Sequence, residues 1–200
     1  MAAFEVDPAA VQAFKDAEAL WRWYERYHAS ADELWIRLAR KGSGIPSVTP
    51  AEALDAALCW GWIDAIRKSL DETAFLQRYT RRKKNSIWSK INIGHVERLR
   101  AAGRMQQAGE AEVARALQDG RWTQAYGSFR DDEFPADLLA AIEAEPRAWA
   151  LFDTLTAQNR FALAFRTHKM KTPAGRARKI AEFVEMLKRG ETIHPNGKTK

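Results

Sequence analysis

The sequence contains one cysteine, Cys59, and no long hydrophobic segment. A single cysteine cannot form an internal disulfide, which excludes a disulfide-stabilised extracellular scaffold. The longest apolar stretch, residues 54–63, is interrupted by Asp55 and falls well short of the roughly 20 residues that a membrane-spanning helix needs. The first residues also lack the basic, apolar and small-residue succession of a signal peptide. The sequence therefore predicts a soluble protein in a reducing, cytoplasmic compartment.

Familiar catalytic and metal-binding motifs are missing as well. There is no GxSxG elbow, no Walker loop and no GxGxxG turn. The four histidines, His28, His95, His168 and His194, are far apart and show no metal-ligand spacing, while Cys59 sits in an apolar helix where a thiol packs more often than it reacts. We therefore expect no metal, no cofactor and no standard catalytic triad, and we assign no catalytic residue.

Tryptophan and basic residues are concentrated in residues 57–92. Trp60, Trp62 and Trp88 supply flat apolar area, and eight lysines and arginines face only three acids, so this segment carries +5 of the chain's net charge of +6. Its basic residues are Arg67, Lys68, Arg78, Arg81, Arg82, Lys83, Lys84 and Lys90. Such a surface suits an anionic partner.

Local signals predict the elements of the first half. Asp7 and Pro8 predict the start of a helix over 8–27, with Phe14 and Tyr24 on its apolar face. Residues 33–40 alternate as a half-buried strand does, and a capping box at Thr49, Pro50 and Glu52 predicts a second helix over 50–60 that buries Leu54, Ala57 and Leu58.

A hairpin follows, formed by residues 62–68 and 74–82. Neither face of its second strand is wholly apolar, which is typical of an edge or binding strand. Asn92 is expected to cap a helix that ends at Gly103, and Gly109 to precede a helix that ends at Gly120.

The C-terminal third is predicted to be helical. Residues 122–132 are rich in turn formers and are interpreted as a linker. Pro135 and Pro146 open short helices, residues 157–169 form a third, and Thr172 with Pro173 caps a fourth that ends at Gly190. Residues 193–200 are expected to be disordered. The predicted fold is α+β, a small antiparallel sheet packed with helices in a domain over 1–125, followed by a helical appendage over 133–190.

The motifs WGWID, RKS, RYTRRKKNSIWSKIN, VERL and GRM, within residues 60–105, resemble those of the bacterial YdeI/OmpD-associated family. The tail TPAGRARKIAEFVEML, residues 172–187, resembles the C-terminal signature of the same family, so the likeness extends over most of residues 20–188. The chain departs from the family at Arg81, between Thr80 and Arg82, where family members often carry the proline of a TPRK motif. This departure affects only where the strand is expected to end. The resemblance implies an α+β fold and a stress-tolerance setting, with links to outer-membrane porins and bacteriocin or antimicrobial-peptide tolerance. It supplies no catalytic residue.

Two basic zones are candidates for binding an anion. Guanidinium, ammonium, indole and hydroxyl groups of the hairpin can hold phosphate, carboxylate or a base, but the tryptophans can equally be core and the basic run a solvated face. A second zone, residues 160–179, contains no acid, and its Arg176 and Arg178 lie in the first turns of a predicted helix, where a bound anion would offset their unfavourable interaction with the helix dipole. We predict that both zones face one groove. The predicted ligand-binding residues are Trp62, Arg67, Lys68, Arg78, Arg81, Arg82, Lys84, Ser86, Trp88, Ser89, Asn92, Arg176 and Arg178.

The sequence favours a non-enzymatic protein that binds an anionic small molecule or a protein partner. One alternative is an enzyme acting on a small anionic metabolite with Asp64 as base, although an ion pair of Asp64 with Arg67 or Lys68 is the favoured role for that carboxylate. Another is nucleic-acid binding, for which the basic run is short. A fourth reading is a scaffold that docks a protein through its tryptophans.

Overall fold

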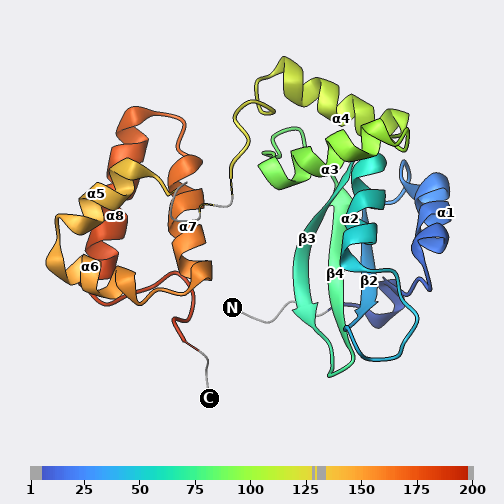
Figure 1. The fold of residues 1–200 in the computed structure, drawn as a ribbon, viewed down its shortest axis with the longest axis horizontal. Coiled ribbons are helices and arrows are strands. Elements are labelled where there is room, and N and C mark those ends of the chain that lie inside the picture. The colour runs from blue at the N-terminus through green and yellow to red at the C-terminus, as the bar shows by residue number, and fades with distance from the viewer. Residues whose placement is uncertain (1–5, 128, 130–133, 198–200) are drawn as a thin grey trace. The chain divides into compact units, whose positions relative to one another are not determined.

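The computed structural model describes residues 6–127, 129 and 134–197. The chain forms two compact units, Met1–Gln124 and Ala125–Lys200, and each is described by itself (Figure 1). The first unit contains a four-stranded sheet with helices, and the described elements of the second are helices. The predicted α+β class is confirmed. Part of the expected linker, at 128 and 130–132, lies outside the described residues.

The predicted helix over 8–27 is wrong in its first half. Pro8–Ala10 form a short 3-10 helix capped by Asp7, and Val11–Gln12 form strand β1. Helix α1 is Ala17–Tyr27, and it starts where the Asp16 carboxylate accepts from the backbone N–H of Ala19 at 2.8 Å. Asp16 therefore supplies a second N-cap, while the residues before it gain backbone pairing in the sheet.

The sheet has the strand order β1-β2-β4-β3. Strand β2 is Glu33–Ala39, and the predicted hairpin is confirmed as β3, Trp62–Ser69, and β4, Ala74–Arg81. The sheet is mixed and not purely antiparallel, because β1 adds to β2 in parallel. Strand β4 is also not an edge strand, since β2 pairs along it on one side and β3 on the other. The edge strands are β1 and β3, and β3 has an irregular register between Asp64 and Arg67.

Helices α2, Pro50–Cys59, α3, Lys90–Ala101, and α4, Gln107–Gln118, complete the first unit. The capping box of α2 is confirmed, although Leu54 is only half-buried. Ser89, not Asn92, caps α3, because its hydroxyl accepts from the Asn92 N–H at 3.1 Å. Helix α4 begins before Gly109 and contains it. In Figure 1, α3 and α4 gather at the end of the sheet where β3 begins and β4 ends.

The core of the first unit lies between α1, α2 and the sheet. Leu20 and Tyr24 of α1 pack there with Ile36 and Leu38 of β2, all fully buried. Trp62 joins them at 1% exposure. The strands and helices of this unit thus share one apolar interior, whose burial is the main favourable term for folding.

The described part of the second unit is built from α5, Ala136–Glu143, α6, Pro146–Asp153, α7, Ala157–His168, and α8, Pro173–Lys188. The four helices predicted from the sequence are confirmed. Their shared core contains nine buried residues, Leu138, Ile142, Ala148, Phe152, Leu155, Leu163, Phe183, Val184 and Leu187.

The expected disorder of 193–200 is wrong for the residues that the structure describes, which reach 197. Asn159, 1% exposed, donates to the His194 carbonyl at 3.0 Å and accepts from the His194 N–H at 2.9 Å. The Thr156 N–H donates to the Asn196 side-chain oxygen at 2.8 Å. Paired buried amides of this kind hold the segment against the start of α7.

Candidate functional site

Several predicted basic residues are engaged by acids within the first unit. Arg78 donates to the Glu33 carboxylate, with Nε at 2.7 Å, and Arg81 pairs with Asp32 and donates to the Ala29 carbonyl at 3.3 Å. The Asp32 side chain is 89% exposed, and exposed ion pairs of this kind contribute little to stability. Arg81 can therefore take another anion in place of Asp32 at small cost.

Arg67, Lys68 and Lys84 differ from one another in their surroundings. Arg67 donates to the Gln77 side-chain oxygen at 2.8 Å, and its guanidinium lies 4.5 Å from the centre of the Phe75 ring. Lys68 is half-buried and Lys84 is exposed. The basic hairpin is thus only partly an open cationic surface.

Arg82 is buried, with 6% of its surface exposed. Its guanidinium stacks 3.6 Å from the centre of the Trp88 ring, and Nη1 donates to the Ile87 carbonyl at 3.1 Å. Trp88 is itself 2% exposed and packs against Trp122 with 4.9 Å between ring centres. These contacts give Arg82 and Trp88 a structural role. Their predicted role in ligand binding stays a prediction.

The predicted hydroxyl and amide ligands also make internal bonds. Ser86 accepts from the Lys83 N–H at 3.2 Å, and its carbonyl accepts from Arg121 at 2.7 Å. Ser89 is buried and caps α3 through the N–H of Asn92. These residues shape the turn between β4 and α3.

The second basic zone belongs to the other unit. Arg176 makes two bonds to Asp137, at 2.6 and 2.8 Å, and donates to the Thr167 carbonyl at 3.1 Å, while Arg178 is exposed. The helix-dipole conflict of Arg176 is thus offset by a carboxylate of the chain itself. Because Arg81 and Arg178 lie in different units, the shared groove stays a prediction.

The structure brings three predicted residues, Trp62, Arg81 and Arg82, together in a cleft of the first unit. The cleft consists of two adjoining hollows of about 450 and 460 Å³ that share His28, Trp60 and Ala108. We call it the His28–Trp60 cleft. Its complete lining is His28, Ala29, Trp60, Gly61, Trp62, Arg81, Arg82, Gln106, Gln107, Ala108, Ala111 and Glu112.

His28 and Trp60 form an aromatic pair in this cleft, with 4.5 Å between ring centres. His28 Nδ1 lies 2.9 Å from the Tyr24 carbonyl, which can only accept, so Nδ1 holds the proton and Nε2 is the remaining hydrogen-bonding atom. The indole N–H of Trp60 is buried and has no partner among the described residues. A buried donor without a partner is uncommon in folded proteins.

The N-terminus of α4 borders the same cleft. Its N-cap, Gln106, makes no side-chain capping bond, and both Gln107 and Ala108 line the cleft. The first N–H groups of a helix and its dipole favour a negative charge. Glu112, the acid in the lining, pairs with Arg115 one turn along the helix.

Sequence reasoning missed His28, Trp60 and the start of α4. The WGW motif contained one signal, a glycine between two tryptophans. Glycine is favoured where the backbone turns with a positive φ, and Gly61 has φ +76°. The turn at Gly61 separates the two tryptophans: Trp60 is half-buried on the cleft, and Trp62 is buried and donates its indole N–H to the His28 carbonyl at 3.1 Å. A glycine between two tryptophans therefore indicated two different environments.

Cys59 and Asp64 are the other two residues considered for catalysis, and burial affects the pKa of both. Burial raises the pKa of the Cys59 thiol to about 11, which keeps the thiol protonated and poorly nucleophilic at neutral pH. Desolvation raises the pKa of the Asp64 carboxyl, and the charges of Arg67 and Arg82 work against it. Asp64 does not line the His28–Trp60 cleft.

His95 and Arg98 of α3 converge on Asp55 of α2. Asp55 lies 2.7 Å from His95 Nδ1 and 2.6 Å from Arg98 Nη2, and its side chain is 14% exposed. Desolvation works against ionisation, but the bonds from Arg98 and His95 outweigh it and lower the pKa of Asp55. The cluster joins two helices of the first unit.

We expect Asp55→Asn to lower the free energy of unfolding at neutral pH by about 1 kcal/mol. This value allows for solvent screening of the ion pair, because the Arg98 side chain is 55% exposed. Because the folded pKa is lowered, this stabilisation is present above the unfolded pKa of about 3.9 and is lost as the pH falls through the folded value. Urea denaturation at pH 7 and at pH 3 measures it. The stability difference between native protein and variant should be smaller at pH 3 than at pH 7, whereas Asp32→Asn, at an exposed carboxylate, should change little at either pH.

Within residues 6–127, 129 and 134–197, no group of three or more histidine, cysteine, aspartate or glutamate side chains is arranged to hold a metal ion. In the same part of the chain, no helix has both the length and the apolar character that crossing a bilayer requires.

The fold and the cleft define a two-unit α+β protein with an aromatic and basic hollow in its first unit. Residues 12–112, half of the 200-residue chain, match the family described as a domain of unknown function, DUF8412, and the chain belongs to that family. Residues 133–190 match the family described as Bacteriocin-protection, YdeI or OmpD-Associated, which confirms over these residues the family recognised from the sequence. The sequence block 60–105 lies within the first match. No curated protein and no solved structure matches the chain.

Proposed function

We propose that the first unit binds an anionic ligand in the His28–Trp60 cleft, and that the protein is a non-enzymatic, cytoplasmic, bacterial stress-tolerance protein. The description of the family matched at 133–190, which names bacteriocin protection, supports the role in stress tolerance. The first part depends on one observation, the convergence of cationic and aromatic groups on a single hollow.

Two features of the cleft favour an anion. Arg81 is at its margin with 48% of its side chain exposed, and its present partner, Asp32, is an exposed carboxylate that a ligand can replace. The uncapped N-terminus of α4 adds the positive end of a helix dipole. Charge-assisted bonds from these groups would hold a phosphate or carboxylate.

The other wall of the cleft favours a ligand that also has a flat apolar part. The rings of His28 and Trp60 form that wall. Stacking on aromatic side chains contributes about 1–3 kcal/mol per planar group in nucleobase complexes. We therefore favour a small planar anion over inorganic phosphate alone.

Arg81→Gln tests this function. We expect it to weaken binding of adenosine monophosphate or benzoate about tenfold, because one charge-assisted contact is lost. Nuclear magnetic resonance titration of the Trp60 indole N–H signal measures it. Arg78→Gln is the matched control, since Arg78 lies on the same strand, is also paired with a carboxylate and does not line the cleft.

The outcomes separate the alternatives. Equal weakening by the two variants, or an unmoved Trp60 signal with both probes, would overturn the proposal. A steep loss of affinity for oligonucleotides with added salt would favour nucleic-acid binding, in which many phosphates are contacted. Enzymatic use of Asp64, whose raised pKa is the observation in its favour, requires that Asp64→Asn abolish turnover of a bound metabolite while the ligand still binds.

A further inference from the structure

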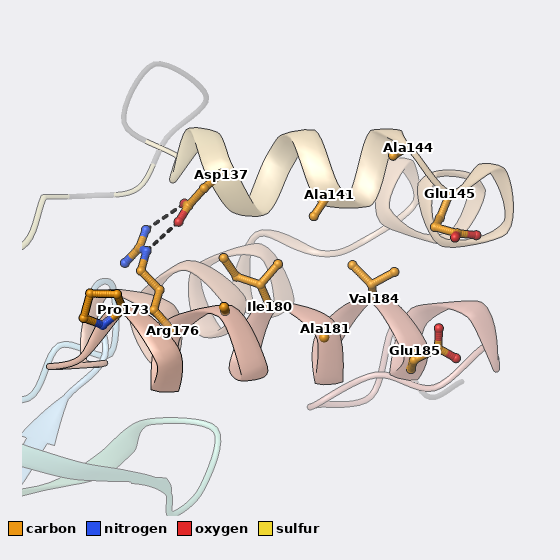
Figure 2. Close-up of a pocket in the computed structure, with 11 residues that line it drawn as sticks. Asp137, Ala141, Ala144, Glu145, Pro173, Arg176, Ile180, Ala181, Val184 and Glu185 are labelled. Atoms are coloured by element: carbon orange, nitrogen blue, oxygen red, sulfur yellow. Dashed lines mark hydrogen bonds and ion pairs between the residues drawn. The ribbon is translucent and has the colours of Figure 1, made fainter.

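A groove runs between α5 and α8 of the second unit, in the region that matches the Bacteriocin-protection family (Figure 2). Its volume is about 620 Å³. The lining is Asp137, Ala141, Ala144, Glu145, Pro173, Arg176, Ala177, Ile180, Ala181, Val184 and Glu185. No part of the His28–Trp60 cleft belongs to it, because the two sites lie in different units.

The floor of the groove is apolar and flat. Its α8 residues recur every three or four positions from Pro173 to Glu185, so they form one face of the helix over about 18 Å at 1.5 Å per residue. Four of the lining residues are alanines, and in Figure 2 the side chains of Ile180, Val184 and Ala141 lie between the two helices. Small side chains allow another helix to approach closely enough to pack.

Charge is placed at the two ends of the groove. Asp137 at one end is neutralised by Arg176, as the dashed lines of Figure 2 mark. At the other end Glu145 and Glu185, 44% and 56% exposed, share a single ammonium group, that of Lys188, at 3.6 and 2.8 Å. Arg189, which also interacts with Glu185, pairs with Glu191, so three carboxylates face two cations and negative charge remains at this end, on a chain whose net charge is +6.

We propose that this groove binds a short, basic amphipathic helix from another polypeptide. The apolar stripe of that helix packs on the alanine-rich floor, and a lysine or arginine of the partner pairs with Glu145 and Glu185. An apolar floor of three to four helical turns with carboxylates at one end is the pattern used in helix-in-groove recognition, in which residues spaced i, i+3, i+4 and i+7 anchor the ligand. Opposite charge at the end of the groove fixes the direction of the helix.

The test uses the full chain and a synthetic peptide of about 12 residues, the length that spans the groove as a helix. Leucines occupy one helical face of the peptide and lysines the other. We expect binding to shift the amide signals of Ala141, Ala177 and Ala181. Glu185→Lys should weaken binding roughly tenfold, since a favourable charge contact becomes repulsive.

Glu182→Lys is the matched control. Glu182 lies on the same helix, is half-exposed and pairs with Lys179 three residues away, as Glu185 pairs with Lys188, but it does not line the groove. Its substitution should leave the affinity within about twofold. A second pair, Ala181→Arg in the groove and Ala174→Arg elsewhere on α8, tests the floor, and only the first should block the peptide.

Each contrary result overturns the proposal. If the two glutamate variants weaken binding equally, the attraction is general electrostatics and not recognition by the groove. If a peptide with glutamates in place of the lysines binds as well, the charge argument is wrong. If the chain forms dimers that Ala181→Arg dissociates, a second copy occupies the groove.

Discussion

Arg82→Ala is expected to lower the free energy of unfolding of the first unit by about 3 kcal/mol. The change removes a buried guanidinium that stacks on Trp88 at 3.6 Å and donates to the Ile87 carbonyl. Stacking of a desolvated cation on an indole contributes about 2 kcal/mol, and a carbonyl left without its donor costs about 1 kcal/mol or more. Urea denaturation followed by tryptophan fluorescence measures the loss.

Arg81→Ala is the control for this prediction. Arg81 is the preceding residue and carries the same charge, but its side chain is 48% exposed and its partner Asp32 is more exposed still. We expect a change within about 0.5 kcal/mol, as for other exposed ion pairs. Equal stability losses for the two variants would contradict the distinction between a structural Arg82 and a ligand-accessible Arg81.

Elements whose signals are local could be predicted from the sequence. The Thr49 capping box, the hairpin around the Asp71 turn and the Thr172 cap of α8 each depend on residues within a few positions of one another. Asp71, for example, accepts from the N–H groups of Thr73 and Ala74 at 2.7 and 2.8 Å. Such contacts do not depend on the tertiary structure, so they can be recognised in the sequence.

Elements that depend on distant partners could not be predicted. Strand β1 exists because Val11 and Gln12 pair with Trp35 and Ile36, and no pattern within 8–27 indicates that pairing. The interior position of β4 has the same origin. Its mixed polar and apolar composition is typical of an edge strand, but β2 pairs along the side that would be the edge. In each case tertiary pairing overrides a plausible local preference.

The candidate site depends on both local and distant residues. The density of charge and tryptophan in residues 57–92 indicated the segment that contributes Trp62 and Arg81 to the proposed site in the cleft, which stays a prediction. Which arginines face solvent depends on acids elsewhere: Glu33 takes Arg78, 45 positions away in sequence. The cleft also needs His28 and α4, which are brought to Trp60 only by folding.

Gly109→Ala is expected to destabilise the first unit by about 3 kcal/mol, at the upper end of the usual cost of overpacking. A Cβ at this position would lie 2.3 Å from the Cys59 carbonyl oxygen and 2.6 Å from that of Leu58. Both atoms are backbone at the end of α2, so they cannot rotate away, and α4 must move from α2. Because Gln107 and Ala108 of α4 line the His28–Trp60 cleft, ligand binding should fall as well.

The same substitution in α3 should have the opposite sign. Gly94 is also a helical glycine, and a Cβ there would meet no atom within 4 Å. Gly94→Ala is expected to raise the free energy of unfolding by about 0.5–1 kcal/mol, because alanine has the higher helix propensity and restricts the unfolded chain. Urea denaturation of both variants, with the ligand titration repeated on each, measures the contrast. If Gly109→Ala behaves like Gly94→Ala, the close contact between α4 and α2 is wrong and the cleft must be formed differently.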